Sequence, residues 1–349
     1  MTVVKISGRE ISLNAPPFIV AELSGNHGGS LQKALELVEV ASMCGVDAIK
    51  LQTYKPETMT LDMNVNEFKI NVGGLWNGRS LFDLYKEGQT PWEWHKEIFD
   101  LANKLNLIAF SSPFDATAVD FLQELDVPCF KIASSEVTDL PLIRKVSETG
   151  KPLLISTGMA SLIEIDEAIT AARTSGCAQI VLLKCTASYP AKPEELNLET
   201  IAHMRETFGC EVGFSDHSIG IGGAIMSIAY GASVIEKHLS LDVNDGAIDS
   251  EFSMIPQSMK QLVEEVKSTW LSKGEVKYGP TESELKSIKY RRSLYAIKDI
   301  NEGEVLSHDN VKAIRPGLGL KIKYIDILIG KKVNKSIKRG TPLNWDIIS

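Results

Sequence analysis

Eight short runs of β-branched and aliphatic residues recur along the chain, and each is followed by a segment with helical periodicity. Such runs, bounded by turn residues, predict strands, and their alternation with helices indicates a parallel sheet. Eight strand–helix units favour a closed (β/α)8 TIM barrel, an α/β fold, over an open Rossmann sheet. No Gly-x-Gly-x-x-Gly fingerprint follows the first strand, which weighs against the Rossmann alternative. The expected strands are residues 17–23, 48–53, 108–114, 128–134, 152–158, 180–186, 211–217 and 233–239.

Two departures from this pattern suggest how the rest of the chain is organised. Residues 55–90 form an insertion after the second strand, on the face where barrel active sites lie. Its aromatic and aliphatic content argues against disorder, which leaves a functional segment or a packed loop without function. After Gly274, a polar run predicts a boundary, and residues 298–311 resemble residues 335–348, which predicts two similar β-turn-β pieces. We therefore expect a barrel over residues 1–280, a linker over 281–290 and a small β-rich domain over 291–349.

Composition and charge limit the possible classes of function. Of the 349 residues, 44% are hydrophobic and 23% are charged, which is typical of a globular chain. The net charge of −8 weighs against non-specific nucleic-acid binding, so an anionic ligand would need a local basic pocket. The five cysteines form no Cys-x-x-Cys pair, and no apolar run resembles a signal peptide or a membrane span. We expect a soluble, cytoplasmic protein.

Polar and charged residues stand at the C-terminal ends of the predicted strands. A lysine or glutamate in an apolar strand is costly to bury unless it is paired, and at this end of a barrel strand it usually marks a functional site. One such residue could be a structural ion pair, but lysine or glutamate recurs inside five of the eight strands, beyond the first residue. We predict a site that draws on Glu22, Lys50, Gln52, Ser111, Ser112, Lys131, Ser134, Ser156, Thr186, Ser215, His217, Glu236 and His238.

Two of these residues are histidines on neighbouring predicted strands. His217 and His238 could reach one divalent ion and leave positions open for water and substrate oxygens. A pair of hydrogen-bonded histidines without a metal is the alternative interpretation. His27, which follows the first strand, could be a functional or a packing residue.

The lysines and serines of this set suit an anionic ligand. Lys50 and Lys131 supply positive charge, and the short hydroxyls around them supply fixed hydrogen bonds, which favours a phosphate or a phosphate with a carboxylate. Glu22 and Glu236 do not fit a purely phosphate-binding pocket. Each could orient a lysine, act as a general acid or base, or hold a metal-bound water.

The strand-end motifs resemble those of the sialic acid synthase family, and the resemblance runs from Ile19 to the C-terminus. The segment SLYAIKDINEGEVLSHDNVKAIRPGLG is similar to the antifreeze-like (SAF) domain of that family. Within the insertion, GGLWNGRSLFDLYKEGQTPWEWH resembles the pseudaminic acid synthase branch. The strand-end motifs are AELSGNHGGSL, DAIKLQTY, FSSPFD, FKIASSE, ISTGMAS, KCTASYP, GFSDHS and IEKHLSLD.

This resemblance implies an activity and a set of residue roles. The family condenses phosphoenolpyruvate with an amino-sugar aldehyde to give a nine-carbon 2-keto sugar acid and phosphate; for the pseudaminic branch the aldehyde is 2,4-diacetamido-2,4,6-trideoxy-L-altrose. A divalent metal, commonly manganese, would lie on His217 and His238, and Glu22 and Glu236 match active-site glutamates. The implied phosphoenolpyruvate contacts are Lys50, Ser112, Lys131, Ser134, Ser156 and Ser215.

The resemblance also implies a sugar side to the site. Tyr189 and Asp249 match sugar-binding residues, and Arg315 matches an arginine that the antifreeze-like domain inserts into the partner subunit's active site. A domain-swapped homodimer is therefore expected. Ala187 stands where the family carries asparagine, so one contact to phosphoenolpyruvate should be missing or replaced by Ser188 or water.

Other functions remain open at this point. The barrel could be a class I aldolase with Lys131 or Lys184 as the Schiff base, or a non-catalytic carbohydrate- or ice-binding protein. Among synthases, the acceptor could instead be the precursor of N-acetylneuraminic or legionaminic acid.

Overall fold

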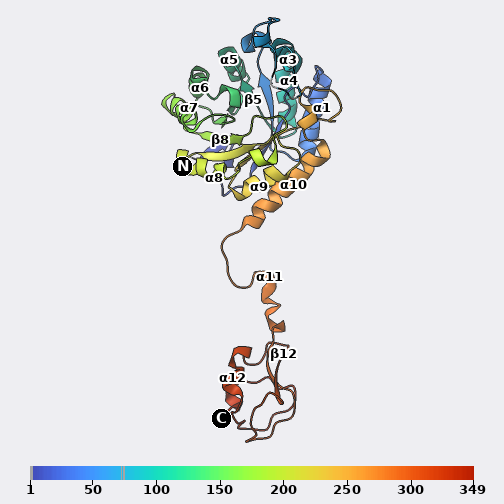
Figure 1. Ribbon diagram of the computed structural model, residues 1–349, viewed down its shortest axis with the longest axis vertical. Coiled ribbons are helices and arrows are strands. Elements are labelled where there is room, and N and C mark those ends of the chain that lie inside the picture. The colour runs from blue at the N-terminus through green and yellow to red at the C-terminus, as the bar shows by residue number, and fades with distance from the viewer. Residues whose placement is uncertain (1–2, 72, 74) are drawn as a thin grey trace. The chain divides into compact units, whose positions relative to one another are not determined.

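A closed barrel of eight parallel strands forms the first of two compact units into which the chain divides, Met1–Gly274 and Glu275–Ser349. The computed structural model describes residues 3–71, 73 and 75–349 (Figure 1). Each strand pairs with the next along the chain, and the last pairs with the first, as predicted for a (β/α)8 barrel. The barrel strands are β3 (Phe18–Glu22), β4 (Ala48–Thr53), β5 (Ile108–Pro113), β6 (Phe130–Ile132), β7 (Leu153–Ser156), β8 (Ile180–Cys185), β9 (Glu211–Ser215) and β10 (Val234–His238).

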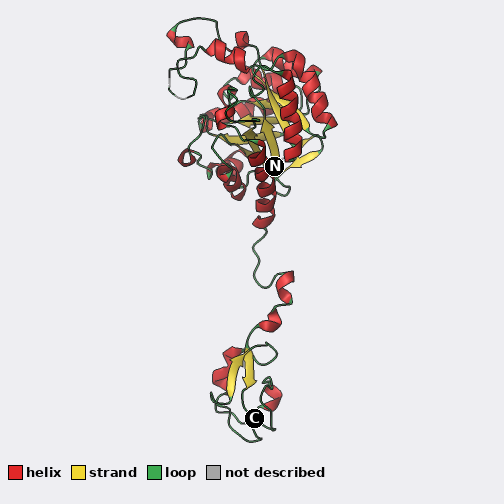
Figure 2. Ribbon diagram, turned by 90° about the vertical axis from the view of Figure 1, so that its right-hand side faces the viewer, coloured by secondary structure: helices red, strands yellow, loops and turns green. Residues whose placement is uncertain are grey.

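Helices surround the strands, and the larger apolar core lies between the two layers (Figure 2). Their boundaries follow local sequence signals: Ser161 and Glu164 form a capping box at the start of α7, and Gly45 ends α1 with a φ of 82°. Along the described part of the chain, no helix combines the length and the apolar composition needed to cross a membrane. The main helices of this layer are α1 (Leu31–Cys44), α4 (Trp92–Lys104), α5 (Ala116–Glu124), α6 (Leu140–Ser147), α7 (Leu162–Thr174), α8 (Thr200–Phe208), α9 (Gly222–Ala229) and α10 (Pro256–Lys273).

The interior of the barrel changes character along its axis. Alternate strand residues point inward, so Phe18, Val20 and Glu22 of β3 follow one another up the inside. The lower positions join an apolar cluster that includes Phe110 and Leu154, whereas the upper positions carry charge. The two-residue strand period therefore directs the polar strand-end side chains into the mouth of the barrel.

Two elements of the first unit were not predicted as secondary structure. A hairpin of β1 (Val4–Ile6) and β2 (Arg9–Ile11) places apolar residues on the interior cluster at the base of the barrel. In the insertion, α2 (Pro56–Met59) and α3 (Leu81–Gly88) pack on one another. The described part of the insertion is thus folded.

The second unit has its own core and an internal symmetry. It contains α11 (Glu282–Leu285), β11 (Ser293–Ala296), β12 (Val311–Ile314) and α12 (Ile325–Leu328). The two repeated segments pair with each other: Ile300 and Ile337 exchange backbone hydrogen bonds of 2.9 and 2.8 Å. Gly303 N donates to Val333 O, and the residues 37 positions later and earlier, Gly340 and Ala296, form the equivalent bond.

Gly213 offers a test of packing inside the barrel. A Cβ added there would lie 2.6 Å from Val234 Cβ and 2.7 Å from Leu183 Cδ2, so Gly213→Ala should lower the free energy of unfolding by about 1–3 kcal/mol. Gly222→Ala is the matched control, because nothing lies within 4 Å of its added Cβ. Denaturant titration followed by circular dichroism measures both. An alanine at position 213 as stable as the control would contradict this packing.

Candidate active site

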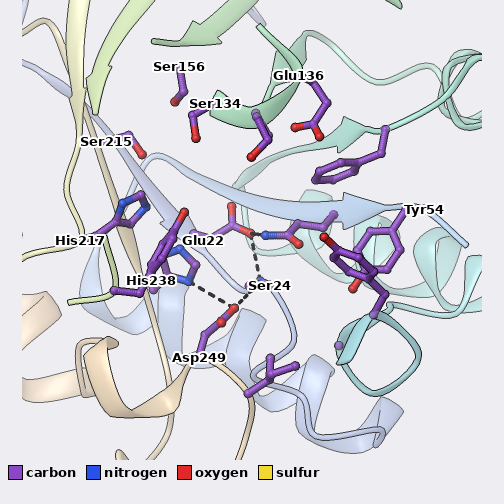
Figure 3. Close-up of a pocket in the computed structure, with 18 of the residues that line it drawn as sticks. Glu22, Ser24, Tyr54, Ser134, Glu136, Ser156, Ser215, His217, His238 and Asp249 are labelled. Atoms are coloured by element: carbon purple, nitrogen blue, oxygen red, sulfur yellow. Dashed lines mark hydrogen bonds and ion pairs between the residues drawn. The ribbon is translucent and has the colours of Figure 1, made fainter. Parts of the chain in front are cut away.

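A cavity of about 330 Å³ lies at the C-terminal ends of the barrel strands (Figure 3). Four residues predicted from the sequence do not line it. Ser111 and Ser112 are fully buried, and Ser112 accepts a 3.3 Å hydrogen bond from Lys50 Nζ. Thr186 Oγ1 accepts a 3.3 Å hydrogen bond from Lys184 Nζ, and Arg315 belongs to the second unit. The cavity brings together the other predicted residues, Glu22, Lys50, Gln52, Lys131, Ser134, Ser156, Tyr189, Ser215, His217, Glu236, His238 and Asp249.

Four buried charges form the floor of this cavity. Lys131 Nζ donates to both carboxylate oxygens of Glu236, at 2.8 and 3.2 Å, and Lys50 forms an ion pair with Glu22. A second contact of 3.9 Å links Lys50 to Glu236. All four side chains are no more than 5% exposed. Two ammonium groups and two carboxylates therefore balance one another in a region that excludes most water.

The two carboxylates have different proton affinities. Burial alone would raise the pKa of Glu236, but Lys131 and Lys50 lower it well below the usual range. Burial raises the pKa of Glu22, and Lys50 only partly opposes that effect. Glu236 is thus fixed as an anion, whereas Glu22 takes up a proton more readily, which is the arrangement expected of an electrostatic anchor beside a general acid or base.

Hydroxyl groups complete the anion-binding side. Ser215 Oγ donates to Glu236 Oε1 at 2.8 Å, while Ser156 Oγ is buried with no hydrogen-bond partner among the described residues. A buried hydroxyl without a partner at a cavity wall is suited to bind a ligand. Ser188, which could have replaced the family's asparagine at Ala187, donates instead to Pro190 O.

The two histidines meet at the cavity with their ring centroids 5.4 Å apart. His217 Nδ1 lies 3.0 Å from Thr186 O, and since a carbonyl oxygen only accepts, Nδ1 carries the proton and Nε2 keeps its lone pair. His238 Nδ1 is buried without a hydrogen-bond partner in the described structure. Burial lowers the pKa of both rings, which keeps them neutral. Two neutral imidazoles with free nitrogens fit a divalent metal.

The protein supplies few further metal ligands nearby. Within the described residues, no group of three His, Cys, Asp or Glu side chains has the geometry of a metal site. Asp249 Oδ2 lies 3.7 Å from His238 Nδ1 and accepts a hydrogen bond from Ser24 Oγ. A metal on the two histidines would therefore need oxygens of water or substrate to complete its coordination.

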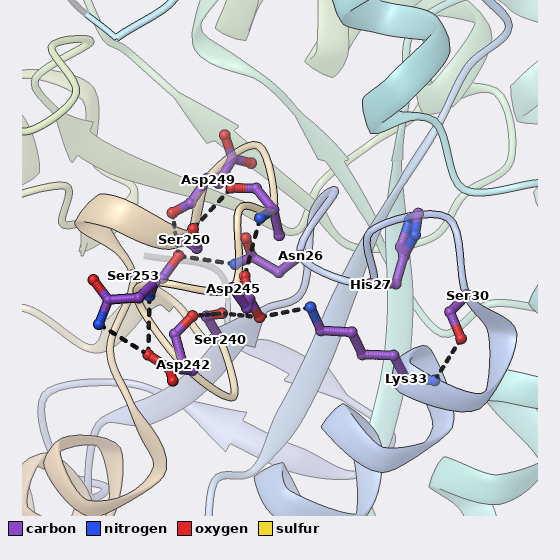
Figure 4. A network of polar contacts seen from close by, with 12 residues as sticks. Asn26, His27, Ser30, Lys33, Ser240, Asp242, Asp245, Asp249, Ser250 and Ser253 are labelled. Atoms are coloured by element: carbon purple, nitrogen blue, oxygen red, sulfur yellow. Dashed lines mark hydrogen bonds and ion pairs between the residues drawn. The ribbon is translucent and has the colours of Figure 1, made fainter.

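His27 belongs to the scaffold of the site. Its Nδ1 accepts a 3.1 Å hydrogen bond from Gly29 N, so Nε2 carries the proton and donates to Thr90 Oγ1 at 3.2 Å. Beside it, Lys33 forms a 2.5 Å ion pair with Asp245 (Figure 4). The His27 contact ties the loop after β3 to the insertion, and the Lys33 contact ties the start of α1 to the loop after β10. His27 is thus a buried packing residue.

The insertion supplies the apolar wall. Trp76 Nε1 donates to Ile248 O at 3.1 Å, and its ring lies 5.6 Å from that of Tyr189. Tyr189 in turn lies 4.5 Å from the His217 ring. The insertion also contributes Met59, Ile70, Leu81 and Leu84 to this wall, and Phe114, directly after β5, adds to it.

Sequence reasoning missed several lining residues, of which Glu136 is the most informative. It lies on the 3-10 turn after β6, two positions beyond Ser134, and its Oε2 is buried without a partner among the described residues. Burial raises its pKa to about 7. An acidic residue just past a barrel strand was the available signal. Ser24 and Tyr54 are two further polar lining residues that the sequence did not single out.

The fold and cavity define a barrel protein with a pocket suited to a small anionic ligand at the carboxyl ends of its strands. The family model described as the NeuB family matches residues 37–278, and the SAF domain matches residues 291–348. The chain belongs to the NeuB family.

Two curated relatives and one solved structure illustrate the similarity. The chain is 42% identical to a Campylobacter jejuni pseudaminic acid synthase (93% of this chain, 95% of the relative) and 43% identical to one from Helicobacter pylori (95% and 98%). The crystal structure of an N-acetylneuraminic acid synthetase from Leptospira borgpetersenii matches with a TM-score of 0.73 at 29% identity, over 82% of this chain and 95% of that one.

Glu136 gives a pH prediction. A carboxyl group with a raised pKa in the folded state binds its proton more tightly there, so its contribution to stability is lost as pH rises from about 4.5 to about 7. Glu136→Gln should therefore match the wild type near pH 4.5 and exceed it by about 3 kcal/mol at pH 8. Urea unfolding at both values measures the difference, with Glu124→Gln, an exposed position, as the control. Parallel pH curves for wild type and Glu136→Gln would refute the assignment.

Proposed function

We propose that this protein condenses phosphoenolpyruvate with 2,4-diacetamido-2,4,6-trideoxy-L-altrose to give a nine-carbon 2-keto sugar acid and inorganic phosphate, the reaction of a pseudaminic acid synthase. The observation that carries the proposal is the meeting of two buried ammonium groups and two free imidazoles in one cavity. The relatives of the pseudaminic branch support the choice of acceptor.

The anion-binding side would hold phosphoenolpyruvate. Lys50 and Lys131 would balance its phosphate and carboxylate charges, and Ser134, Ser156 and Ser215 would donate hydrogen bonds to its oxygens. Ser112 would act through Lys50, because its hydroxyl accepts a hydrogen bond from the Lys50 ammonium group. In the ligand-free protein the two glutamates neutralise the ammonium groups of Lys50 and Lys131. A bound anion would take over part of that neutralisation.

The histidine side would hold the aldehyde end of the acceptor. A divalent metal on His217 and His238, with manganese as the ion that the resemblance implies, would supply Lewis-acid polarisation of the aldehyde oxygen. His217 is held in the ligating tautomer by Thr186 O, and Asp249 lies next to His238.

The two glutamates divide the remaining chemistry. C3 of phosphoenolpyruvate attacks the aldehyde carbon, a C–C bond forms, and positive charge develops at C2. Glu236, fixed as an anion, stabilises that charge. Glu22 accepts a proton from the water that adds at C2 and returns it to the aldehyde oxygen, which has become an alkoxide. The tetrahedral intermediate then expels phosphate with cleavage of its C–O bond, and the C2 hydroxyl gives its proton to the phosphate as the ketone forms.

The far end of the cavity suits a deoxy sugar. The insertion lines it with apolar side chains around Trp76, where a 6-methyl group could be buried. Tyr189 and Asp249 supply a hydroxyl and a carboxylate for the polar groups of the sugar. Burial of one methyl group contributes about 1–3 kcal/mol of discrimination.

The second unit would complete the site as a lid. Residues 275–349 carry 15 lysines and arginines against 9 acidic residues, which leaves 22 basic and 36 acidic residues in the barrel unit. Opposite net charges favour docking of this module on a barrel. We propose a domain-swapped homodimer, with residues 281–290 as the linker and Arg315 reaching the sugar in the partner's cavity.

We place the protein in the cytoplasm on the state of its thiols. All five cysteines are buried and free. A reducing compartment is where such a set of thiols is normally found.

A class I aldolase is the second candidate, because burial lowers the pKa of Lys131 and so favours the nucleophilic amine. Lys184, the other lysine considered, donates to Cys185 O and Thr186 Oγ1. The two candidates differ in the bond that breaks, which the next experiment reads.

Turnover with labelled phosphoenolpyruvate tests the proposed function. With ¹⁸O at the bridging oxygen, C–O cleavage should place the label in the released phosphate, read by mass spectrometry.

The 6-deoxy diacetamido sugar should be preferred over N-acetylmannosamine by about 10–200-fold in kcat/KM. Lys131→Met should lower turnover at least 100-fold, whereas the control Lys184→Met should change it little. Inactivation by borohydride with substrate, or better turnover of N-acetylmannosamine, would overturn the assignment.

Mixing two inactive variants tests the lid. Arg315→Ala should weaken turnover of the sugar, and His217→Ala should abolish it within a folded barrel. If Arg315 acts across a dimer, hybrids of the two chains recover activity, since one site combines an intact barrel with an intact lid. Failure to complement after subunit exchange has been demonstrated would refute the swapped arrangement.

A further inference from the structure

Lys237 is a buried lysine that takes no part in the cavity. Its Nζ donates to Asp216 Oδ2 at 2.8 Å and to Ser218 O at 2.8 Å, and its side chain is 2% exposed. Strand alternation turns Lys237 away from the barrel interior, whereas its neighbours Glu236 and His238 line the cavity. The ion pair therefore lies on the outer face of the strands.

This ion pair flanks both histidines. Asp216 directly precedes His217, and Lys237 directly precedes His238. Asp216 Oδ1 also accepts from Ser218 N at 2.8 Å and from Ser218 Oγ at 2.7 Å, which closes a turn around His217. Lys237 thus forms hydrogen bonds to this turn on both sides of His217, one to the Asp216 side chain and one to the Ser218 carbonyl.

The Lys237 side-chain bonds lie just beyond the point where the backbone pairing between β9 and β10 stops. In the described structure, the last backbone bond between them runs from Asp216 N to Glu236 O at 2.9 Å. Beyond it, His217 O accepts from Ala191 N, on the other side. The Lys237 side chain is what continues to join β10 to the segment that carries His217.

We infer that the Lys237–Asp216 ion pair is the positioning device that fixes the spacing of the His217 and His238 rings, and through it the affinity for a divalent cation. The inference rests on the metal site of the proposed function. An apolar pair of similar volume could fill the same space without loss of stability, but it would supply no directional bonds to Ser218. Groups that orient metal ligands from behind typically change metal affinity about 10–100-fold when they are removed.

The test measures Mn²⁺ binding to the full-length chain by isothermal titration calorimetry, without substrates. Lys237→Met should weaken binding at least 10-fold and alter the visible absorption bands of the Co²⁺-loaded protein. Arg205→Met is the matched control: Arg205 pairs with Glu211 at 2.9 Å, with side chains 8% and 9% exposed, at the opposite end of β9. It removes a buried ion pair at the start of β9 but should leave the Mn²⁺ affinity within twofold of wild type. An affinity of Lys237→Met equal to that of this control would overturn the inference.

A double variant separates positioning from general stability. Asp216→Asn with Lys237→Met leaves no buried unpaired charge, so its unfolding free energy should return toward wild type while Mn²⁺ binding stays weak. Recovery of both would reduce the ion pair to a structural role and overturn the inference. This variant also carries the test if Lys237→Met alone does not fold.

A readout on the metal-free protein keeps the inference distinct from the proposed function. The Nδ1 proton of His217, donated to Thr186 O, should give a slowly exchanging ring signal in nitrogen-edited NMR spectra of wild type and Arg205→Met. Lys237→Met should lose or shift it. Absence of Mn²⁺ binding in wild type would refute the metal site alone, and an unchanged His217 proton in Lys237→Met would refute the positioning role.

Discussion

The charge balance inside the barrel mouth is the constraint on which the rest of the site depends. Two lysines and two glutamates are buried together, and none could remain ionised there alone. In the ligand-free protein each lysine forms an ion pair with one glutamate: Lys131 with Glu236, and Lys50 with Glu22. A trianionic substrate therefore competes with carboxylates already in place. Binding must therefore redistribute the hydrogen bonds of the two lysines between the substrate and the two glutamates.

The barrel itself explains why these charges sit where they do. Strand period sorts each strand into inward and outward residues, and the inward ones grade from aromatic and aliphatic below to charged above. Gly213 shows how tightly the layers fit, because its missing side chain makes room for Val234 and Leu183. The β1–β2 hairpin seals the apolar end. The charged cavity therefore lies above a barrel interior that is closed and apolar.

Much of this could be predicted from sequence, because it depends on local pattern. The eight strands follow from runs of β-branched residues, and the polar strand ends follow from their position in those runs. What the sequence could not supply are pairings between distant segments. His27 is a packing residue because Thr90, 63 positions away, meets its ring. Glu136 escaped notice because it lies beyond the end of β6, and the β1–β2 hairpin because its strands are only three residues long.

The reciprocal bonds of the C-terminal unit have a consequence for how such a module can be cut and rearranged. Ile300 and Ile337 each donate a backbone hydrogen bond to the other, as equivalent residues of two chains do across a twofold axis. The unit therefore resembles a symmetric dimer whose two halves are joined in one chain. Half of it would be self-complementary, and a peptide carrying one copy would tend to associate with its own kind. The stretch joining the two copies contributes to the same pairing, because Val333 accepts the bond from Gly303 N and Lys331 O accepts a bond from Leu306 N. Arg315 also stands in this joining stretch, directly after the end of β12 at Ile314.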